Sequence, residues 1–217
     1  RSAARIKPII LLKAGRHEAG AMATATHSGM AAVSDTVFDA AVRRAGVVRV
    51  QNVGQLFYAA KALASKFRPL GNRLAIITNG GGPGAMAADR AGDLGIPLAE
   101  LANDTMAALN KALPTNWSHS NPIDIGGDAT PERYREAILA VTQDPHVDST
   151  LVMLSPQAMT EPLAVAKAII EVADKLNRSL ICCWMGEEQV REARQVLEDA
   201  GIPAFRMPET AVELYYH

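Results

Sequence analysis

The stretch LAIITNGGGPGAMAADRA at residues 74–91 decides the fold, because it runs from an apolar strand through a glycine turn into a helix. This order of elements brings backbone N–H groups and the positive end of a helix dipole to one place. Short apolar runs alternate with helix-length amphipathic stretches along the rest of the chain. Such alternation is typical of βα units on a mainly parallel sheet, so the sequence predicts an α/β fold.

Residues 72–217 are expected to form one complete domain. Its strands are expected at residues 74–78, 98–101, 150–154, 180–184 and 204–207. Its helices are expected at residues 84–94, 104–113, 131–142, 163–176, 188–200 and 210–216. The runs at residues 151–154 and 180–183 are continuously apolar, which is typical of strands covered on both faces. These features predict a flavodoxin-like domain of three layers with a parallel sheet.

Residues 1–71 are expected to form a second, smaller unit. Its expected elements are strands at 9–13 and 47–50, helices at 35–45 and 54–66, and a small-residue loop at 15–33. Ser34 suits the N-cap of the first helix, and Gly46 suits its C-terminal stop. Residues 67–72 interrupt both periodicities, so we place the domain boundary there. The unit is too small to be a flavodoxin-like domain alone and is expected to be the second half of one.

Composition limits the classes of partner and compartment. The net charge of −1 at pH 7 gives no sign of a nucleic-acid or anionic-membrane partner. No apolar run approaches the roughly 20 residues that cross a bilayer, and no signal-peptide pattern opens the chain. Cys182 and Cys183 are adjacent in an apolar run, so we expect reduced core thiols in a cytoplasmic protein. The chain does not begin with Met and is expected to be a piece of a longer polypeptide.

The glycine turn at residues 80–84 is a candidate anion site. No Gly-Lys-Ser/Thr follows it, so the turn is not a P-loop. Gly82, Gly84 and Ala87 fit a dinucleotide-binding pattern, and Glu100 lies where that pattern expects a ribose-binding acid. The pattern leaves open a phosphate site, a dinucleotide site and a tight structural turn.

A second glycine-containing loop, residues 121–131, also runs into a helix. Gly126 and Gly127 permit close backbone approach at the carboxyl edge of the sheet, where ligands of open α/β sheets bind. Asp124 and Asp128 would repel a bare phosphate unless a cation intervenes. We therefore treat the two glycines as a further candidate binding loop.

His27 is a candidate nucleophile in the small-residue loop. Loop histidines are commonly solvated surface groups, and no Asp or Glu lies within six residues to orient this one. However, Thr24, Thr26 and Ser28 offer hydroxyl donors, and neutral imidazole is a competent nucleophile toward phosphorus. Both interpretations stay open. The remaining histidines lack metal-ligand spacing, so no metal site is expected.

Several segments in combination resemble a known family. KPIILLKAGR (residues 7–16), THSG (26–29) and DAAVRRAGVVRV (39–50) look like the second domain of NDP-forming acyl-CoA synthetases, relatives of succinyl-CoA synthetase. TNGGGPG (78–84) and NPIDIGGDA (121–129) resemble the ligase-CoA flavodoxin-like domain of the same family. The resemblance extends over essentially the whole chain.

This resemblance implies roles for particular residues. His27 matches the phosphohistidine of the family, with Ser28 where Thr is commoner. The helix N-terminus that holds the phosphorylated ring matches Gly80, Gly81, Gly82, Gly84 and Ala85. Positions that contact the acyl substrate match Asn79, Gln157, Ala158 and Met159.

The implied activity is that of an ADP-forming acid-thiol ligase, which makes acyl-CoA from a carboxylic acid, CoA and ATP through acyl phosphate and phosphohistidine. CoA, ATP or ADP and Mg²⁺ would bind to the complete protein, whereas no cofactor is expected on this fragment alone. The CoA-binding and ATP-grasp domains are expected on the missing parts or on partner subunits, and the assembly is expected to be an oligomer.

A regulatory alternative comes from PTNWSHSNP at residues 114–122. This segment is most similar to bacterial proteins in which the ligase region is fused to a GNAT acetyltransferase domain. The chain would then be a non-catalytic, acyl-CoA-sensing or scaffold region of a protein lysine acetyltransferase. The nucleophile candidate His27 favours the ligase, because a scaffold does not need one.

Overall fold

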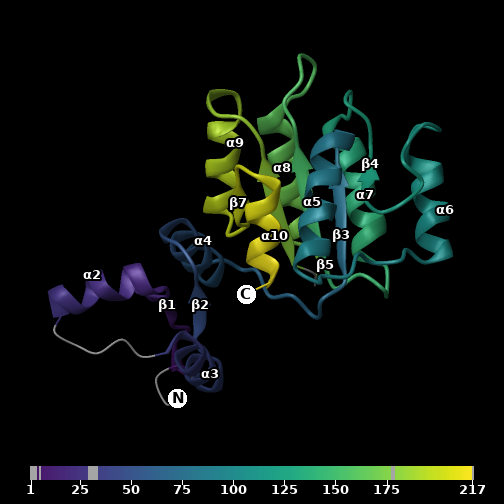
Figure 1. Cartoon of the computed structure of the whole chain (residues 1–217). Coiled ribbons are helices and arrows are strands. Elements are labelled where there is room, and N and C mark those ends of the chain that lie inside the picture. The colour runs from purple at the N-terminus through teal and green to yellow at the C-terminus, as the bar shows by residue number, and fades with distance from the viewer. Residues whose placement is uncertain (1–3, 5, 29–33, 177–178, 217) are drawn as a thin grey trace. The chain divides into compact units, whose positions relative to one another are not determined.

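The computed structural model describes residues 4, 6–28, 34–176 and 179–216. The chain divides into two compact units, Arg1–Leu63 and Ala64–Tyr216, which Figure 1 shows in purple to blue and in blue to yellow. The boundary placed after residue 71 from sequence falls inside the second unit. Among the described residues, no helix is long and apolar enough to cross a membrane.

The first unit contains a two-stranded parallel sheet in which Ile10 pairs with Val48 and Leu12 with Val50. Its elements are β1 (Ile10–Leu12), α2 (Glu18–Ser28), α3 (Asp35–Ala45), β2 (Val48–Val50) and α4 (Val53–Ala64). Gly46 ends α3 with φ of 70°, as expected for a left-handed stop.

Helix α2 occupies part of the segment that the sequence predicts to be a loop. Its sequence, EAGAMATATHS, is rich in alanine, which has the highest helix propensity. However, small residues all round the helix leave no apolar stripe, so periodicity gives no signal for it. The expected loop at residues 15–33 is therefore wrong for residues 18–28.

The second unit is built on a five-stranded parallel sheet in the order β4-β3-β5-β6-β7. The strands are β3 (Leu74–Thr78), β4 (Ile123–Asp124), β5 (Ser149–Leu154), β6 (Leu180–Trp184) and β7 (Ala204–Phe205). Counted within this unit, the order is 2-1-3-4-5, which is the flavodoxin-like order. The predicted fold class is confirmed.

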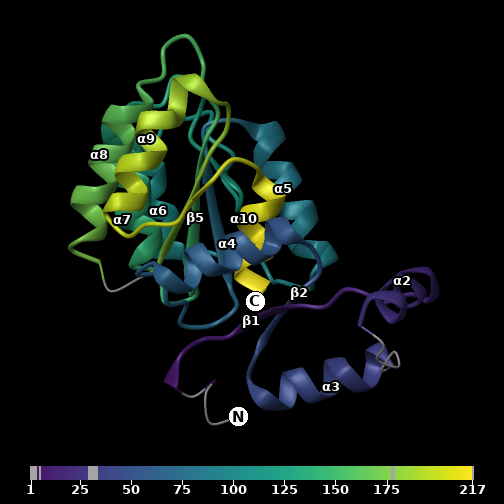
Figure 2. The ribbon, with the colours of Figure 1, turned by 90° about the vertical axis from the view of Figure 1, so that its left-hand side faces the viewer.

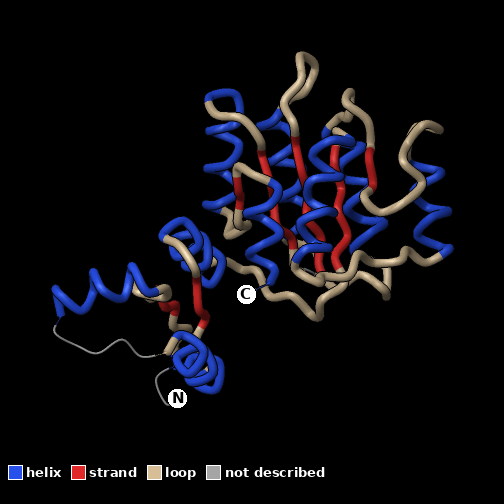
Figure 3. Tube along the Cα trace, viewed as in Figure 1, coloured by secondary structure: helices blue, strands red, loops and turns tan. Residues whose placement is uncertain are grey.

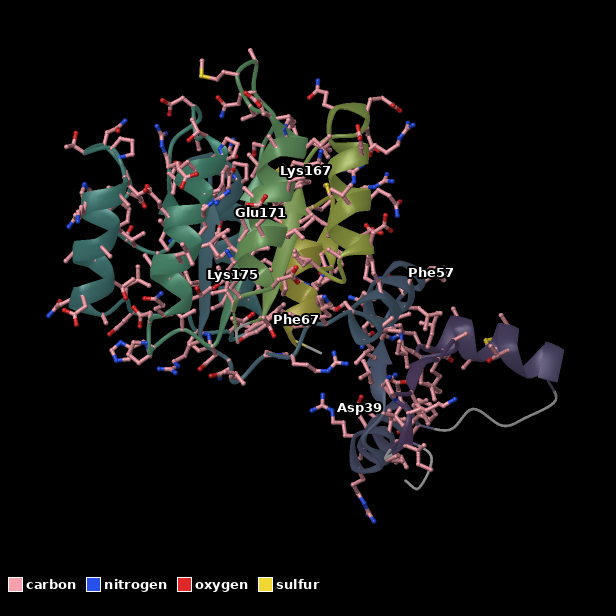
Figure 4. All side chains as sticks on the ribbon, turned by 180° about the vertical axis from the view of Figure 1, so that it is seen from behind. Asp39, Phe57, Phe67, Lys167, Glu171 and Lys175 are labelled. Atoms are coloured by element: carbon pink, nitrogen blue, oxygen red, sulfur yellow. The ribbon has the colours of Figure 1, made fainter. Side chains whose placement is uncertain are left out.

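Helices cover both faces of this sheet, as the edge-on view in Figure 2 shows. One face carries α5 (Gly81–Asp93) and α10 (Pro208–Tyr216). The other carries α6 (Asn103–Ala112), α7 (Pro131–Thr142), α8 (Pro162–Ala173) and α9 (Glu188–Asp199). Lys167 and Glu171 lie on the exposed side of α8, while its Val165 and Ile169 are buried in the core (Figure 4).

The strands β3, β5 and β6 are buried along their whole length, which explains their continuous apolarity. Cys182 and Cys183 are both buried and free, as expected. Burial raises the pKa of both thiols, that of Cys183 to about 12.

The strand expected at residues 98–101 is wrong: only Leu98 forms an isolated bridge, to Leu74. The side chain of Asn121 explains this difference. Its Oδ1 accepts from Ile76 N–H at 3.0 Å, and its Nδ2 donates to the carbonyls of Leu74 and Ala99. An amide side chain thus replaces part of the ladder beside β3, and the short strand β4 takes the edge position.

Candidate functional site

The candidate residues of the second unit gather where the chain order of the sheet reverses. β4 lies on one side of β3, and β5 lies on the other. The loops that follow these strands therefore diverge at the carboxyl edge, at the top of the view in Figure 3. Open α/β sheets bind ligands in the crevice at such a switch point.

Asn79 links the two strands at this point. It is almost fully buried, with 1% of its surface exposed. Its Nδ2 donates to the Ser155 carbonyl at 2.9 Å, and its Oδ1 accepts from the Ser155 N–H at 2.7 Å. The amide that was expected to contact substrate is thus engaged in joining the loop after β3 to the loop after β5.

The glycine turn opens α5 without a side-chain cap, because the N-cap is Gly80. Pro83 has no N–H, and the N–H of Gly84 donates to the Gly80 carbonyl at 3.2 Å. The N–H groups of Gly81 and Gly82 are then the first-turn donors left for a ligand. The helix begins at Gly81 rather than at residue 84, so these glycines belong to its first turn.

Gly84 has a packing role in addition. A Cβ atom there would lie 2.9 Å from Cγ2 of Thr78, whereas a Cβ on Gly82 would meet nothing within 4 Å. Helix α5 therefore approaches β3 closely only because residue 84 lacks a side chain. Ala85 is exposed on the same turn.

The second glycine loop lies beside the first. Gly126 has φ of 90° and donates its N–H to Oδ1 of Asp124 at 3.0 Å. Oδ2 of the same carboxylate lies 3.2 Å from the place where a Cβ on Gly81 would be. Asp124 therefore lies between the two glycine segments.

Gln157, in the loop after β5, contacts both Asn79 and the second glycine loop. Its Nε2 donates to the Asn79 carbonyl at 3.3 Å, and its amide packs directly against Gly127. Ala158 and Met159 are exposed farther along the same loop. The structure thus brings Gln157 into the cluster and leaves the next two expected residues at its outside.

Two site residues were missed by sequence reasoning, Ser155 and Arg133. Ser155 follows β5 as Asn79 follows β3, so the switch-point rule, applied to both strands, indicates it. Its Oγ donates to Sδ of Met185 at 3.5 Å. Arg133 gives no sequence signal, because a charged residue in the first turns of a helix is usually solvated.

His27 lies in the last turn of α2, in the first unit. Its side chain lies outside the described part of the structure. Within the described residues, no group of three or more His, Cys, Asp or Glu side chains could hold a metal ion.

Comparison with known proteins assigns both units to protein families. Residues 74–214 match the family described as the Ligase-CoA domain. The chain belongs to this family. Residues 1–63 match a second family, described as the succinyl-CoA ligase-like flavodoxin domain. The resemblance found in the sequence is confirmed in both units.

The relatives are ADP-forming ligases. The acetate–CoA ligase [ADP-forming] I of Archaeoglobus fulgidus is 39% identical over 98% of this chain and 30% of its own length. The alpha subunit of acetate–CoA ligase [ADP-forming] I of Pyrococcus furiosus is 36% identical over 95% of this chain and 45% of its own.

A solved structure of a related enzyme is also similar to this chain. The dinucleotide-forming acetyl-coenzyme A synthetase 1 of Ca. Korarchaeum cryptofilum, in complex with phosphate and ADP, has a TM-score of 0.90. It is 34% identical over 99% of this chain and 47% of its own. The chain therefore spans between 30% and 47% of the length of these relatives.

Proposed function

We propose that this chain is the alpha-subunit-like part of an ADP-forming acyl-CoA ligase, with a phosphoryl-binding site at the glycine turn. The observation that carries the proposal is the uncapped N-terminus of α5 at the β3/β5 switch point, where Gly81 and Gly82 offer N–H donors. Two family matches and the ADP-forming relatives support the reaction class.

His27 is proposed to carry the phosphoryl group. In the direction of acyl-CoA formation, its ring nitrogen attacks the γ-phosphorus of ATP, and ADP leaves. A carboxylate oxygen of the acid then attacks the phosphohistidine, which gives acyl phosphate and restores the imidazole. The thiolate of CoA attacks the acyl carbon, the thioester forms, and phosphate leaves; the thiol proton passes to solvent.

The second unit is proposed to hold the phosphoryl group and the acid during these steps. Gly80, Gly81 and Gly82 would face the phosphate, with Gly84 and Ala85 completing the turn. Asn79, Gln157, Ala158 and Met159 would line the acyl side, and Gly126 and Gly127 would approach from the second loop. Asn79 and Gln157 would act mainly by fixing the loops, because their amides are bonded to the protein.

The rest of the enzyme is proposed to lie outside this chain. CoA, ATP and Mg²⁺ would bind to CoA-binding and ATP-grasp domains, on the remaining parts of the polypeptide or on partner subunits of an oligomer in the cytoplasm. The chain's share of its relatives' length is consistent with such a division. The comparisons give no support to the acetyltransferase-linked scaffold.

Phosphorylation of the full-length protein tests the proposal. Incubation with γ-labelled ATP and Mg²⁺ should give acid-labile, base-stable label that is lost in His27→Ala. The matched control is His17→Ala, since His17 is an exposed histidine in the same unit. Label that persists in His27→Ala would refute the assignment of the nucleophile.

A further inference from the structure

The loop between β4 and α7 is held by one arginine of the helix that follows it. Nη1 of Arg133 donates to the Ile125 carbonyl at 3.0 Å and to Oδ1 of Asp128 at 2.6 Å. Its side chain is 17% exposed, whereas that of Asp128 is 63% exposed. Gly126 lies within this ring of contacts, since a Cβ there would be 3.4 Å from Nη1 of Arg133.

The same contacts set the charge beside the second glycine loop. Asp124 and Asp128 would together place two negative charges beside the loop. The hydrogen bond from Arg133 holds the pKa of Asp128 below its usual range, so this carboxyl is ionised and paired. Among the ion pairs of the described residues, none engages Asp124. Arg133 thus offsets one of these two negative charges.

We propose that Arg133 is a positioning residue that lets an anion bind between the two glycine loops, by pairing with Asp128 and offsetting its charge. This inference rests on the proposed function and assigns a determinant of phosphate affinity to that site. Its physical basis is that an unpaired carboxylate a few ångströms from a bound phosphate repels it, and a paired one does so far less.

The helix provides a matched control. Arg135 lies two positions from Arg133 on α7, but its Nη2 donates to Oε2 of Glu171 on α8 at 3.0 Å. Arg135→Gln therefore removes an equal charge from the same helix, together with the ion pairs to Glu171 and Glu132, and does not change the loop. The phosphate affinity of Arg135→Gln therefore shows how much the loss of an arginine from α7 matters when the loop contacts stay intact.

Titration of the 217-residue chain with inorganic phosphate, followed by the amide shifts of Gly81, Gly82, Gly126 and Gly127, tests the proposal. Arg133→Gln should weaken binding about threefold to tenfold, as expected for one nearby unit charge at an effective dielectric constant between those of bulk water and a protein surface. Asp128→Asn should bind phosphate at least as tightly as the unchanged chain. The double variant Arg133→Gln/Asp128→Asn should return to within about twofold of it, and Arg135→Gln should not differ.

Two measurements distinguish an effect of the Arg133 charge from a purely structural effect of its replacement. The defect of Arg133→Gln should shrink in high salt, because a partly exposed charge is screened there. Rescue by Asp128→Asn restores charge balance but not the bond to the Ile125 carbonyl. Unchanged binding in Arg133→Gln, a double variant as weak as the single one, or weaker binding in Asp128→Asn alone would each overturn the inference. If the unchanged chain shows no phosphate-induced shifts, the proposed site itself is wrong; if it shows them, only the role of Arg133 is at stake.

Discussion

The segment that precedes β3 is expected to be a stabilising part of the second unit, and Phe67→Ala measures this directly. Phe67 is 8% exposed and makes an edge contact with Tyr215 at 6.4 Å between ring centroids. Figure 4 places it beneath the end of α8. The backbone around it is bound to distant segments: Lys66 N–H donates to the Gly201 carbonyl and Arg68 N–H to Oγ of Ser179.

The expected cost follows from burial. Replacing a buried Phe by Ala removes about 2–3 kcal/mol of transfer free energy, and incomplete collapse of the space left behind adds to it. Because Phe67 lies at the edge of the core, where neighbours can relax, we expect about 3 kcal/mol in total. For a unit of this size that corresponds to a fall in Tm of about 6–12 °C. The matched control is Leu70→Ala, since Leu70 lies in the same segment and is 65% exposed; we expect a change within about 0.5 kcal/mol.

Calorimetry on the 217-residue chain and on two shortened chains provides the assay. A chain that starts at Ala64 should keep the main transition, whereas one that starts at residue 72 should melt lower by at least the Phe67→Ala shift. Equal melting temperatures for the two shortened chains would refute the reasoning and restore the boundary expected from sequence. A fall in melting temperature for Phe67→Ala that is no larger than that for Leu70→Ala would also refute the reasoning.

Three further outcomes are expected. Gly84→Ala should destabilise the second unit by about 1–3 kcal/mol in chemical denaturation, because its Cβ would meet β3 at 2.9 Å, whereas Gly82→Ala should be neutral or stabilising. Burial alone would raise the pKa of Asp144, but hydrogen bonds to its carboxylate lower it overall; its stabilisation is therefore complete above the ordinary value of 3.8 and lost as pH falls below it. The stability difference between the unchanged chain and Asp144→Asn should accordingly be constant near neutral pH and shrink below about pH 4 in denaturation at a series of pH values. Cys182 and Cys183 should resist a thiol reagent at pH 8 until the chain unfolds, because burial raises both pKa values.

The strands of the second unit were predictable because each apolar run has one explanation. β3, β5 and β6 are covered on both faces, so every side chain is buried and the run is continuous. The helices between them bury one stripe each, which gives the 3.6-residue period. Connections through helices then require parallel pairing, and the flavodoxin-like order follows from a single reversal.

The edge of the sheet was not predictable for a physical reason. β4 has two residues, too few for any period, and it lies in a loop rich in turn residues. The apolar residues 98–101 look like a strand because Leu98 and Ala99 do lie against Leu74. What they lack is a ladder, since the side chain of Asn121 takes the hydrogen bonds instead. A tertiary contact of one amide decides between strand and loop here.

The candidate site also has features that the sequence could predict and features that it could not. The glycines could be found because a turn and a helix start have local signatures in the sequence. The switch-point rule could have indicated Ser155, but the hydrogen bonds between Asn79 and Ser155 could not be predicted, because they form only when β3 and β5 pair. The same holds for Gln157 over Gly127. Sequence reasoning therefore named the glycines and, through the resemblance, Asn79 and Gln157 as candidates, but it missed Ser155 and the contacts by which Asn79 and Gln157 fix the loops.

Under the proposed function, the acidic residue in the cluster has a physical use. Two uncapped N–H groups and the helix dipole stabilise a bound anion by about 0.3–2 kcal/mol. Asp124, whose Oδ2 lies 3.2 Å from the Cβ position of Gly81, opposes that attraction, while Asp128 is paired with Arg133 and adds little further repulsion. A site balanced in this way would bind phosphate weakly. Weak binding suits a phosphoryl group that must arrive and leave once in every turnover, because a tighter site would hold the intermediate and slow its transfer.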